Sequence, residues 1–263
     1  MFCAALAGCT CGGGGEPDGS VLEDGGKLPF DAGTPTGRCE LDLAPWTVDV
    51  GTASLARVEA SSQLIAGPNA HGGLGDYVFA NERIRVVVQG PSRAFGPQPW
   101  GGNIIDADLV DAPAGDQFGE IGLLYNFGRT VRATQFDVVR DGSAGGSVVL
   151  AASGDDTPND YLSIRNQLSN SLGRVPYADP YVAQPLRITT YFILNPGEQR
   201  LQQVTAFCNT DRRNFAGLAV GDLVDPGYVL ELFNPRSCTG GFGFGGLCFG
   251  LDRLPWFGYQ GTG

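Results

Sequence analysis

The sequence predicts an all-β protein, an antiparallel β-sandwich of the supersandwich type that follows a disordered, glycine-rich N-terminal tether. Short runs rich in Val, Ile, Thr, Tyr and Phe alternate with clusters of turn residues, which is typical of strands. No segment carries an apolar stripe at the i, i+3, i+4, i+7 spacing of an amphipathic helix. The 41 glycines and 17 prolines interrupt the chain every few residues, and no fixed-period repeat indicates a propeller or a solenoid.

Two hairpins are predicted where strand-like runs are joined by turn residues. Residues 76–82 and 83–89 form the first, with Asn-Glu at the turn and a β-branched second arm. Residues 186–194 and 201–209 form the second, and they are joined by Asn-Pro-Gly-Glu, a tight-turn sequence. Both pairs predict adjacent antiparallel strands.

A third hairpin is predicted around Asp141-Gly142, between residues 130–139 and 146–152. The first arm alternates between polar and apolar residues along most of its length. Strict alternation places Ala133 and Phe136 on opposite faces of the sheet, because successive side chains point to opposite sides of a strand.

The remaining strand signals are weaker. Residues 215–224 and 228–233 are expected to pair around an Asp-Pro-Gly turn. Residues 153–185 are polar and turn-rich, so we expect them to leave the sheet as a long excursion. Their acidic start, residues 154–160, suits an exposed turn or a Ca²⁺-binding loop, although it lacks the EF-hand spacing.

The N-terminus, Leu6-Ala7-Gly8-Cys9, resembles the lipobox of bacterial lipoproteins, where a signal peptide is cut and the new terminal cysteine is lipidated. The resemblance implies that residues 1–9 are the end of such a signal and that Cys9 is the lipidation site. No Lys or Arg precedes Cys9, so we expect the signal to be truncated here and to begin upstream.

The predicted tether comprises residues 10–45, which carry seven acidic residues and a run of four glycines. Such a segment buries too little apolar surface to offset the entropy of ordering, so we expect it to be disordered. Residues 46–263 form one predicted β-sandwich domain, which we expect to be truncated at its C-terminus. No run approaches the roughly 20 apolar residues that cross a bilayer, so membrane attachment would be through lipid.

The cysteines predict disulfides if the protein is exported. Cys238 and Cys248 bracket a glycine-rich loop, which a bridge would constrain. Cys39 with Cys208 is a second possible pair, but spacing alone does not fix connectivity. Neither the cysteine spacing nor the histidine content indicates a zinc site, so no metal is predicted there.

The charge balance excludes one class of partner. The net charge is −11 and the isoelectric point is about 4.4, so the chain lacks the basic surface that nucleic-acid binding requires. His71 is the only histidine, and every Ser-His-Asp or histidine–metal scheme would have to use it.

Two stretches resemble known families. Residues 75–88 and 101–108 resemble the β-rich N-terminal region of bacterial surface lipoproteins, some of which carry a PHP-type metallohydrolase domain. That resemblance implies an accessory region without the catalytic domain, since the metal site of that domain is rich in histidine. Residues 189–197 followed by 201–209 are similar to paired strands of galactose-mutarotase-like supersandwiches.

A cluster of polar residues in the middle of the chain is the candidate binding site. Asp106 and Asp108 are two residues apart in a predicted strand, so their side chains share a face. Glu120 follows, with Asn126 and Arg129 near the end of the next strand. Converging carboxylates bind hard cations such as Ca²⁺ or act as an acid/base pair, whereas the alternative is a solvated acidic face with Arg129 or Arg132 as counter-ion.

Together these features predict a lipid-anchored, extracytoplasmic β-sandwich module in the cell envelope. We expect it to be non-catalytic, to need no cofactor, and to bind a glycan or protein partner or to support a missing catalytic domain. The glycine-flanked Phe242, Phe244 and Phe249 would stack on a sugar or pack beneath a disulfide-bounded loop. The alternative is a carbohydrate-active enzyme of the mutarotase or glycosidase kind that uses a carboxylate pair.

Overall fold

The computed structural model describes residues 2–9, 38–91, 96, 98–111, 115–116, 119–126, 128–159, 183–211, 220–225 and 259–262. Its strands are β1 (Phe2–Cys9), β2 (Ser54–Arg57), β3 (Tyr77–Ala80), β4 (Ile84–Val88), β5 (Ile104–Leu109), β6 (Glu120–Tyr125), β7 (Arg129–Arg140), β8 (Val148–Pro158), β9 (Leu186–Leu194), β10 (Leu201–Asn209), β11 (Val220–Asp225) and β12 (Tyr259–Thr262). Two short 3₁₀ turns, η1 (Ala44–Trp46) and η2 (Ser61–Gln63), are the helical elements of the described residues. None of the described helices has the length and apolar character of a membrane span.

The strands are hydrogen-bonded in the order β12-β1-β10-β9-β8-β7-β6-β5-β4-β3-β2, and β11 pairs with β6 beside this path. Neighbours from β10 to β2 are antiparallel, whereas β1 runs parallel to β10 and to β12. The prediction of an all-β fold is therefore confirmed. The finer prediction of a sandwich is not confirmed, because one continuous hydrogen-bonded ladder connects β10 to β2.

The ladder is narrowest at two junctions. β5 and β6 share the single pair Ile104–Ile121, and β6 and β7 share the single pair Tyr125–Arg129. Side chains from both sides of these junctions meet in the main core. That core takes buried side chains from every strand between β2 and β10: Ala53, Leu55, Tyr77, Phe79, Ile84, Val86, Val88, Ile104, Ile121, Ala133, Val148, Leu150, Ala152, Phe192, Leu194 and Leu201.

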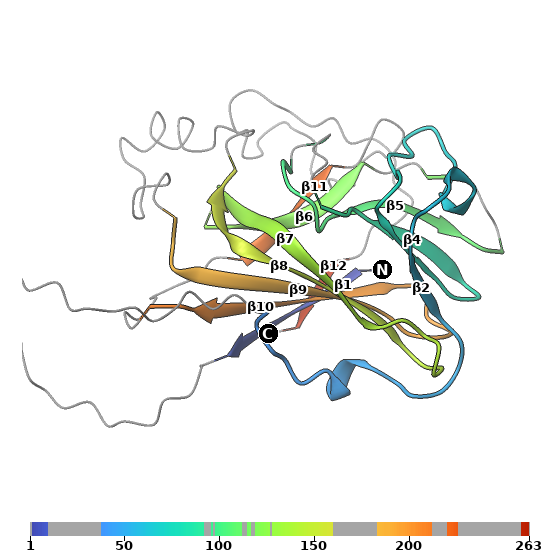
Figure 1. Ribbon diagram of the computed structural model, residues 1–263, viewed down its shortest axis with the longest axis horizontal. Helices are drawn as coiled ribbons and strands as arrows, with labels where there is room; N and C mark the ends of the chain where they lie inside the picture. The colour runs from blue at the N-terminus through green and yellow to red at the C-terminus, as the bar shows by residue number, and fades with distance from the viewer. Residues whose placement is uncertain are drawn as a thin grey trace, which may run out of the picture.

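A second core lies on the other face of β8–β10. It consists of Cys39, Val149, Ala151, Tyr191, Ile193, Val204, Ala206 and Cys208. Leu41, Leu43 and Trp46 pack against it from the segment that precedes β2. We call residues 38–50 the N-terminal strap, and Figure 1 shows it, in blue, running past β10 and through η1 towards β2. The strap shields an apolar sheet face that would otherwise meet water.

The hairpins with short turns match their predicted positions. The predicted arms 76–82 and 83–89 contain β3 and β4, and the predicted arms 186–194 and 201–209 coincide with β9 and β10. The β9–β10 turn bends back onto the β3–β4 turn, where the Asn81 side-chain amide donates to the carbonyl oxygens of Asn195 (2.7 Å) and Glu198 (2.9 Å).

The predicted alternation along β7 is wrong beyond Ala133. The register with β8 shifts between Ala133 and Gln135, which inserts an extra residue into β7. Such a bulge resets which face each following side chain points to. Phe136 therefore packs against the same core as Ala133.

The predicted excursion from the sheet, residues 153–185, was placed too early in the sequence. β8 continues to Pro158, so the start of the acidic stretch is strand rather than an exposed turn. Asp155 and Asp156 pair in register with Arg132 and Val131 of β7. The first arm of the fourth predicted hairpin overlaps β11, which pairs with β6. The predicted second arm of that hairpin, residues 228–233, lies outside the described residues.

Candidate functional site

Asp106 anchors a loop. Its side chain is fully buried, and its two carboxylate oxygens accept the backbone N–H groups of His71 (2.7 Å) and Gly72 (2.8 Å). Burial raises the pKa of Asp106, and the hydrogen bonds from His71 and Gly72 oppose that rise in part. Asp76, which is also buried, accepts the N–H groups of Gly73 (2.7 Å) and Gly90 (2.9 Å). The two carboxylates thus fix three consecutive backbone amides of this loop.

Gly72 is required by this close approach. A Cβ atom at position 72 would lie 2.5 Å from Asp106 Oδ2 and 2.9 Å from Leu64 Cδ2. We expect Gly72→Ala to destabilise the protein by about 1–3 kcal/mol, as overpacking does elsewhere. Gly221→Ala is the control, since a Cβ there meets only the Leu124 carbonyl at 3.8 Å. Urea denaturation checks the difference, and equal midpoints for the two variants would contradict it.

Asp108 accepts hydrogen bonds from a different segment of the chain than Asp106 does. It is half-buried, and its oxygens accept the backbone N–H groups of Leu109 (2.9 Å) and Gly115 (3.2 Å). A nearby acid that the sequence did not single out, Asp116, is fully buried and accepts the N–H of Ala107 at 2.8 Å. The acids of this region bind backbone amides of β5 and of the loops around residues 71–73 and 115.

Glu120 lies in a buried polar network. It is 1% exposed, and its Oε2 accepts the backbone N–H of Gln98 at 3.1 Å. The Gln98 side chain donates to the Leu123 carbonyl (3.0 Å), and the Asn103 side chain donates to Gln89 Oε1 (3.0 Å). Burial raises the pKa of Glu120 to about 7, and the negative charge of Asp225 adds to that rise.

Arg129 is half of a buried ion pair. Its guanidinium donates to Asp156 through Nε at 2.6 Å and through Nη2, and both side chains are almost completely buried. The Tyr125 hydroxyl donates to the same carboxylate, as does the backbone N–H of Gln184 at 2.6 Å. Burial acts to lower the pKa of Arg129, but the hydrogen bond and charge of Asp156 outweigh it and raise that pKa. The counter-ion of Arg129 is therefore Asp156 of β8, not an acid of β5.

Asn126 occupies the turn between β6 and β7 with a φ of 43°, in the left-handed region. Asparagine tolerates this conformation better than most residues, so the backbone accounts for its presence at this turn. Of the five predicted site residues, Asp106 and Asp108 bind loop amides, Glu120 joins a polar network, Asn126 makes a turn and Arg129 forms an ion pair.

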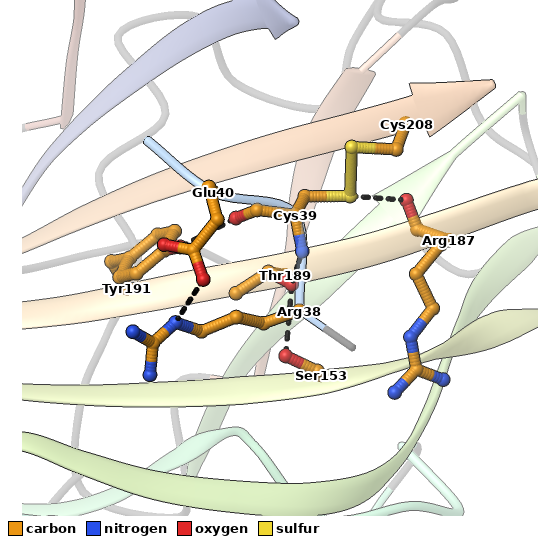
Figure 2. The surroundings of a disulfide bond; sticks show 8 residues. All are labelled: Arg38, Cys39, Glu40, Ser153, Arg187, Thr189, Tyr191 and Cys208. Atoms are coloured by element: carbon orange, nitrogen blue, oxygen red, sulfur yellow. Dashed lines mark hydrogen bonds and ion pairs between the residues drawn. A yellow bond between two sulfur atoms is a disulfide. The ribbon is translucent and has the colours of Figure 1, made fainter. Parts of the chain in front are cut away.

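The strap is fixed to the sheet at Cys39, which forms a disulfide with Cys208 on β10 across 169 residues of sequence (Figure 2). The Cα atoms are 5.9 Å apart. The Cys39 N–H donates to Thr189 Oγ1 (2.9 Å), and the Tyr191 hydroxyl donates to the Cys39 carbonyl (2.5 Å). Thr189 is hydrogen-bonded in turn to Ser153 Oγ at 2.8 Å. Strands β8, β9 and β10 therefore all contribute to the attachment.

A charged residue borders this attachment. The Arg187 carbonyl oxygen lies 3.1 Å from Cys39 Sγ, and its side chain points away from the disulfide (Figure 2). The Arg187 guanidinium donates to Asp155 Oδ1 (3.0 Å) and to Gln135 Oε1 (3.3 Å). Asp155, from the predicted acidic loop, thus joins β8 to β9.

A cavity of about 480 Å³ lies at the β7–β8 turn. Its lining residues are Val138, Val139, Arg140, Asp141, Gly142, Ala144 and Gly145. Hydrogen bonds from the Ser143 hydroxyl and N–H lower the pKa of Asp141. None of the five predicted site residues lines this cavity.

Several predicted features lie outside the described residues: the Cys238–Cys248 disulfide, the Phe242, Phe244 and Phe249 loop, and the tether as far as residue 37. Within the described part of the chain, no three His, Cys, Asp or Glu side chains group in a way that could hold a metal ion. Comparisons with family models, with curated proteins and with solved structures found no match to this chain.

Proposed function

We propose that this chain is a lipid-anchored, extracytoplasmic β module of the bacterial cell envelope. Its role would be non-catalytic: to bind a glycan or protein partner, or to support a catalytic domain carried elsewhere. The lipobox-like Leu6-Ala7-Gly8-Cys9 and the acidic, glycine-rich sequence after it support the anchor and the spacer. Cleavage before Cys9 would remove residues 2–8 of β1, so the processed protein would lack the strand that pairs with β10 and β12.

The Cys39–Cys208 disulfide is the observation that carries this proposal. Structural disulfides persist in oxidising compartments and are rare in the cytosol, so the bond favours export. Its position also fits a tethered module, because Cys39 lies at the start of the strap and near the end of residues 10–45, the sequence expected to serve as tether. A force applied to the tether would be transmitted through the disulfide to β10. The packing of Leu41, Leu43 and Trp46 would then carry no load.

The hydrogen bonding of the predicted site residues supports a non-catalytic role. Asp106 and Asp108 use their oxygens to hold loops, and Arg129 is committed to Asp156. A carbohydrate-active enzyme would instead direct two carboxylates at a shared substrate. One observation favours that alternative: Glu120 has a pKa of about 7 beside Asp225, as a general acid requires. Assays of purified protein with glycosides and with free sugars distinguish the two, since the proposed role expects no turnover.

The anchor is tested by substituting the proposed lipidation site. In a bacterial host, with the upstream reading frame included, we expect the wild-type protein in the membrane fraction and Cys9→Ala in unlipidated form. The physical reason is that lipid attachment requires the Cys9 thiol, and acyl chains provide the membrane affinity. Cys11→Ala is the matched control and should fractionate like the wild type. Membrane attachment of Cys9→Ala equal to that of the wild type would contradict the proposal.

A further inference from the structure

Glu120 is the first residue of β6, and its surroundings do not favour a negative charge on its side chain. One carboxylate oxygen, Oε2, accepts the N–H of Gln98, but the other, Oε1, is buried without a hydrogen-bond partner. The Asn103 side-chain amide also stabilises the charged form and lowers the pKa of Glu120, but it is shared with Gln89 Oε1 (3.0 Å) and the Trp100 carbonyl (2.5 Å), to which it donates as well. A buried carboxylate needs several donors to offset its lost hydration, and the described residues of this pocket supply few.

The pocket is also tightly closed. A Cβ atom at Gly96 would collide with Glu120 Oε2, and a Cβ atom at Gly122 would collide with Asn103 Oδ1. Glycine at both positions lets the backbone and the amide side chains approach the carboxyl group closely. The carboxyl group therefore cannot reach water while this packing persists.

Among the described residues, the charged group that acts on Glu120 is Asp225, which adds repulsion rather than compensation. Asp225 of β11 stands opposite Glu120 in the β6–β11 register, and its carbonyl accepts the Gly119 N–H at 3.1 Å. On the same strand, burial raises the pKa of Asp222 to about 6, and its Oδ1 accepts from Gln203 at 3.3 Å.

Charged side chains of the described strands β5 and β7 have partners other than Glu120. Arg132 of β7 lies over the Trp100 ring at 5.6 Å, and Arg129 is paired with Asp156. Asp106 of β5 holds the 71–72 loop. The described part of residues 96–103 contributes amides and no charge, and no ion pair of the described residues includes Glu120.

We propose that Glu120 is a proton-operated switch that controls how firmly β11 and residues 98–103 hold to β6. In its neutral form the carboxyl group fits the amide-lined pocket and lies beside Asp225 without repulsion. In its ionised form it has too few donors and repels Asp225, so β11 and the Gln98 segment separate from β6 and admit water. The inference concerns the fold and does not depend on the proposed anchor or ligand.

The sign of the pH dependence follows from the raised pKa. Glu120 has a pKa of about 7 in the folded protein against 4.5 for a solvent-exposed glutamate side chain, so the folded state binds the proton more tightly. Stability from this group is complete below pH 4.5 and is lost as the pH rises to about 7. Asp222 contributes in the same direction between 3.8, the pKa of a solvent-exposed aspartate, and about 6.

The test compares the wild type with Glu120→Gln, which keeps the shape and cannot ionise. Urea denaturation from pH 4.5 to pH 8 should show the wild type weakening relative to Glu120→Gln, by on the order of 100-fold in the unfolding equilibrium constant. The exposed Glu59→Gln is the matched control and should follow the wild type at every pH. Parallel pH profiles for wild type and Glu120→Gln would overturn the proposal.

A second measurement applies even if Glu120→Gln fails to fold. Carbon NMR of wild-type protein labelled at glutamate side chains should show one carboxyl that titrates near neutral pH. Asp225→Asn should lower the midpoint of that carboxyl, because it removes the opposing charge. Hydrogen exchange of β11 amides, corrected for the intrinsic pH dependence, should speed up over the same pH range. Glutamate carboxyls that all titrate near 4.5, or β11 protection that is independent of pH, would overturn the switch.

Discussion

Replacing Asp156 by alanine is expected to destabilise the protein by about 3–5 kcal/mol, because it leaves a buried arginine without its counter-ion. Arg129 is 2% exposed, and Asp156 is its ion-pair partner. The same change removes the acceptor for the Tyr125 hydroxyl and for the Gln184 N–H. Urea denaturation at neutral pH measures the loss as a shift of the midpoint.

Asp49→Ala is the control for this prediction. Asp49 pairs with Arg140 at 2.9 Å but is 90% exposed, so its loss should cost less than about 1 kcal/mol. The double variant Arg129→Met, Asp156→Leu should recover most of the stability lost in Asp156→Ala, because no unpaired charge remains buried. If Asp156→Ala costs no more than Asp49→Ala, the buried ion pair does not have the role assigned to it.

Removing the Cys39–Cys208 disulfide is the second large effect. We expect Cys39→Ala, Cys208→Ala and the double variant to lose similar stability, about 2–5 kcal/mol. The bond closes a loop of 169 residues, so its loss enlarges the unfolded ensemble and leaves the strap held by packing and hydrogen bonds alone. Thermal denaturation without reductant measures the effect.

Reductant provides the control for the disulfide. A thiol reductant should lower the stability of the wild type to about that of the untreated double variant. If reductant also lowers the stability of the double variant, that additional loss comes from another disulfide. A wild type that is insensitive to reductant, together with an unchanged double variant, would contradict a structural role for Cys39–Cys208. Faster proteolysis within residues 38–50 of the double variant would show that the strap detaches.

Local sequence signals predicted the fold class and the short hairpins. The turns after β3 and β9 carry residues that favour reversal, and each turn joins strands adjacent in sequence. The bulge in β7 and the length of β8 were missed because distant contacts decide them. Asp155 and Asp156 resemble turn residues, yet Arg187 and Arg129 hold them in a strand. The pairing of β11 with β6 likewise carries no local signal.

The residues of the candidate site could be predicted from the sequence, but their spatial arrangement and their partners could not. The two-residue spacing of Asp106 and Asp108 is correct for one strand, but their partners lie in loops near Gly72 and Gly115 that the spacing does not reveal. The buried environment of Glu120 comes from amide side chains and from the distant strand β11, so composition gives no sign of it. The Cys39–Cys208 pair was one of several connectivities that the sequence left open, and the path of the strap across β9 selects it.

Peptide mapping of protein purified from membranes without reductant tests most directly whether this is an exported module anchored at one end. The account predicts an N-terminal peptide that begins at lipid-modified Cys9, together with a cross-linked peptide that joins Cys39 to Cys208. An unmodified peptide that runs through Cys9, found with free thiols at Cys39 and Cys208, would contradict it.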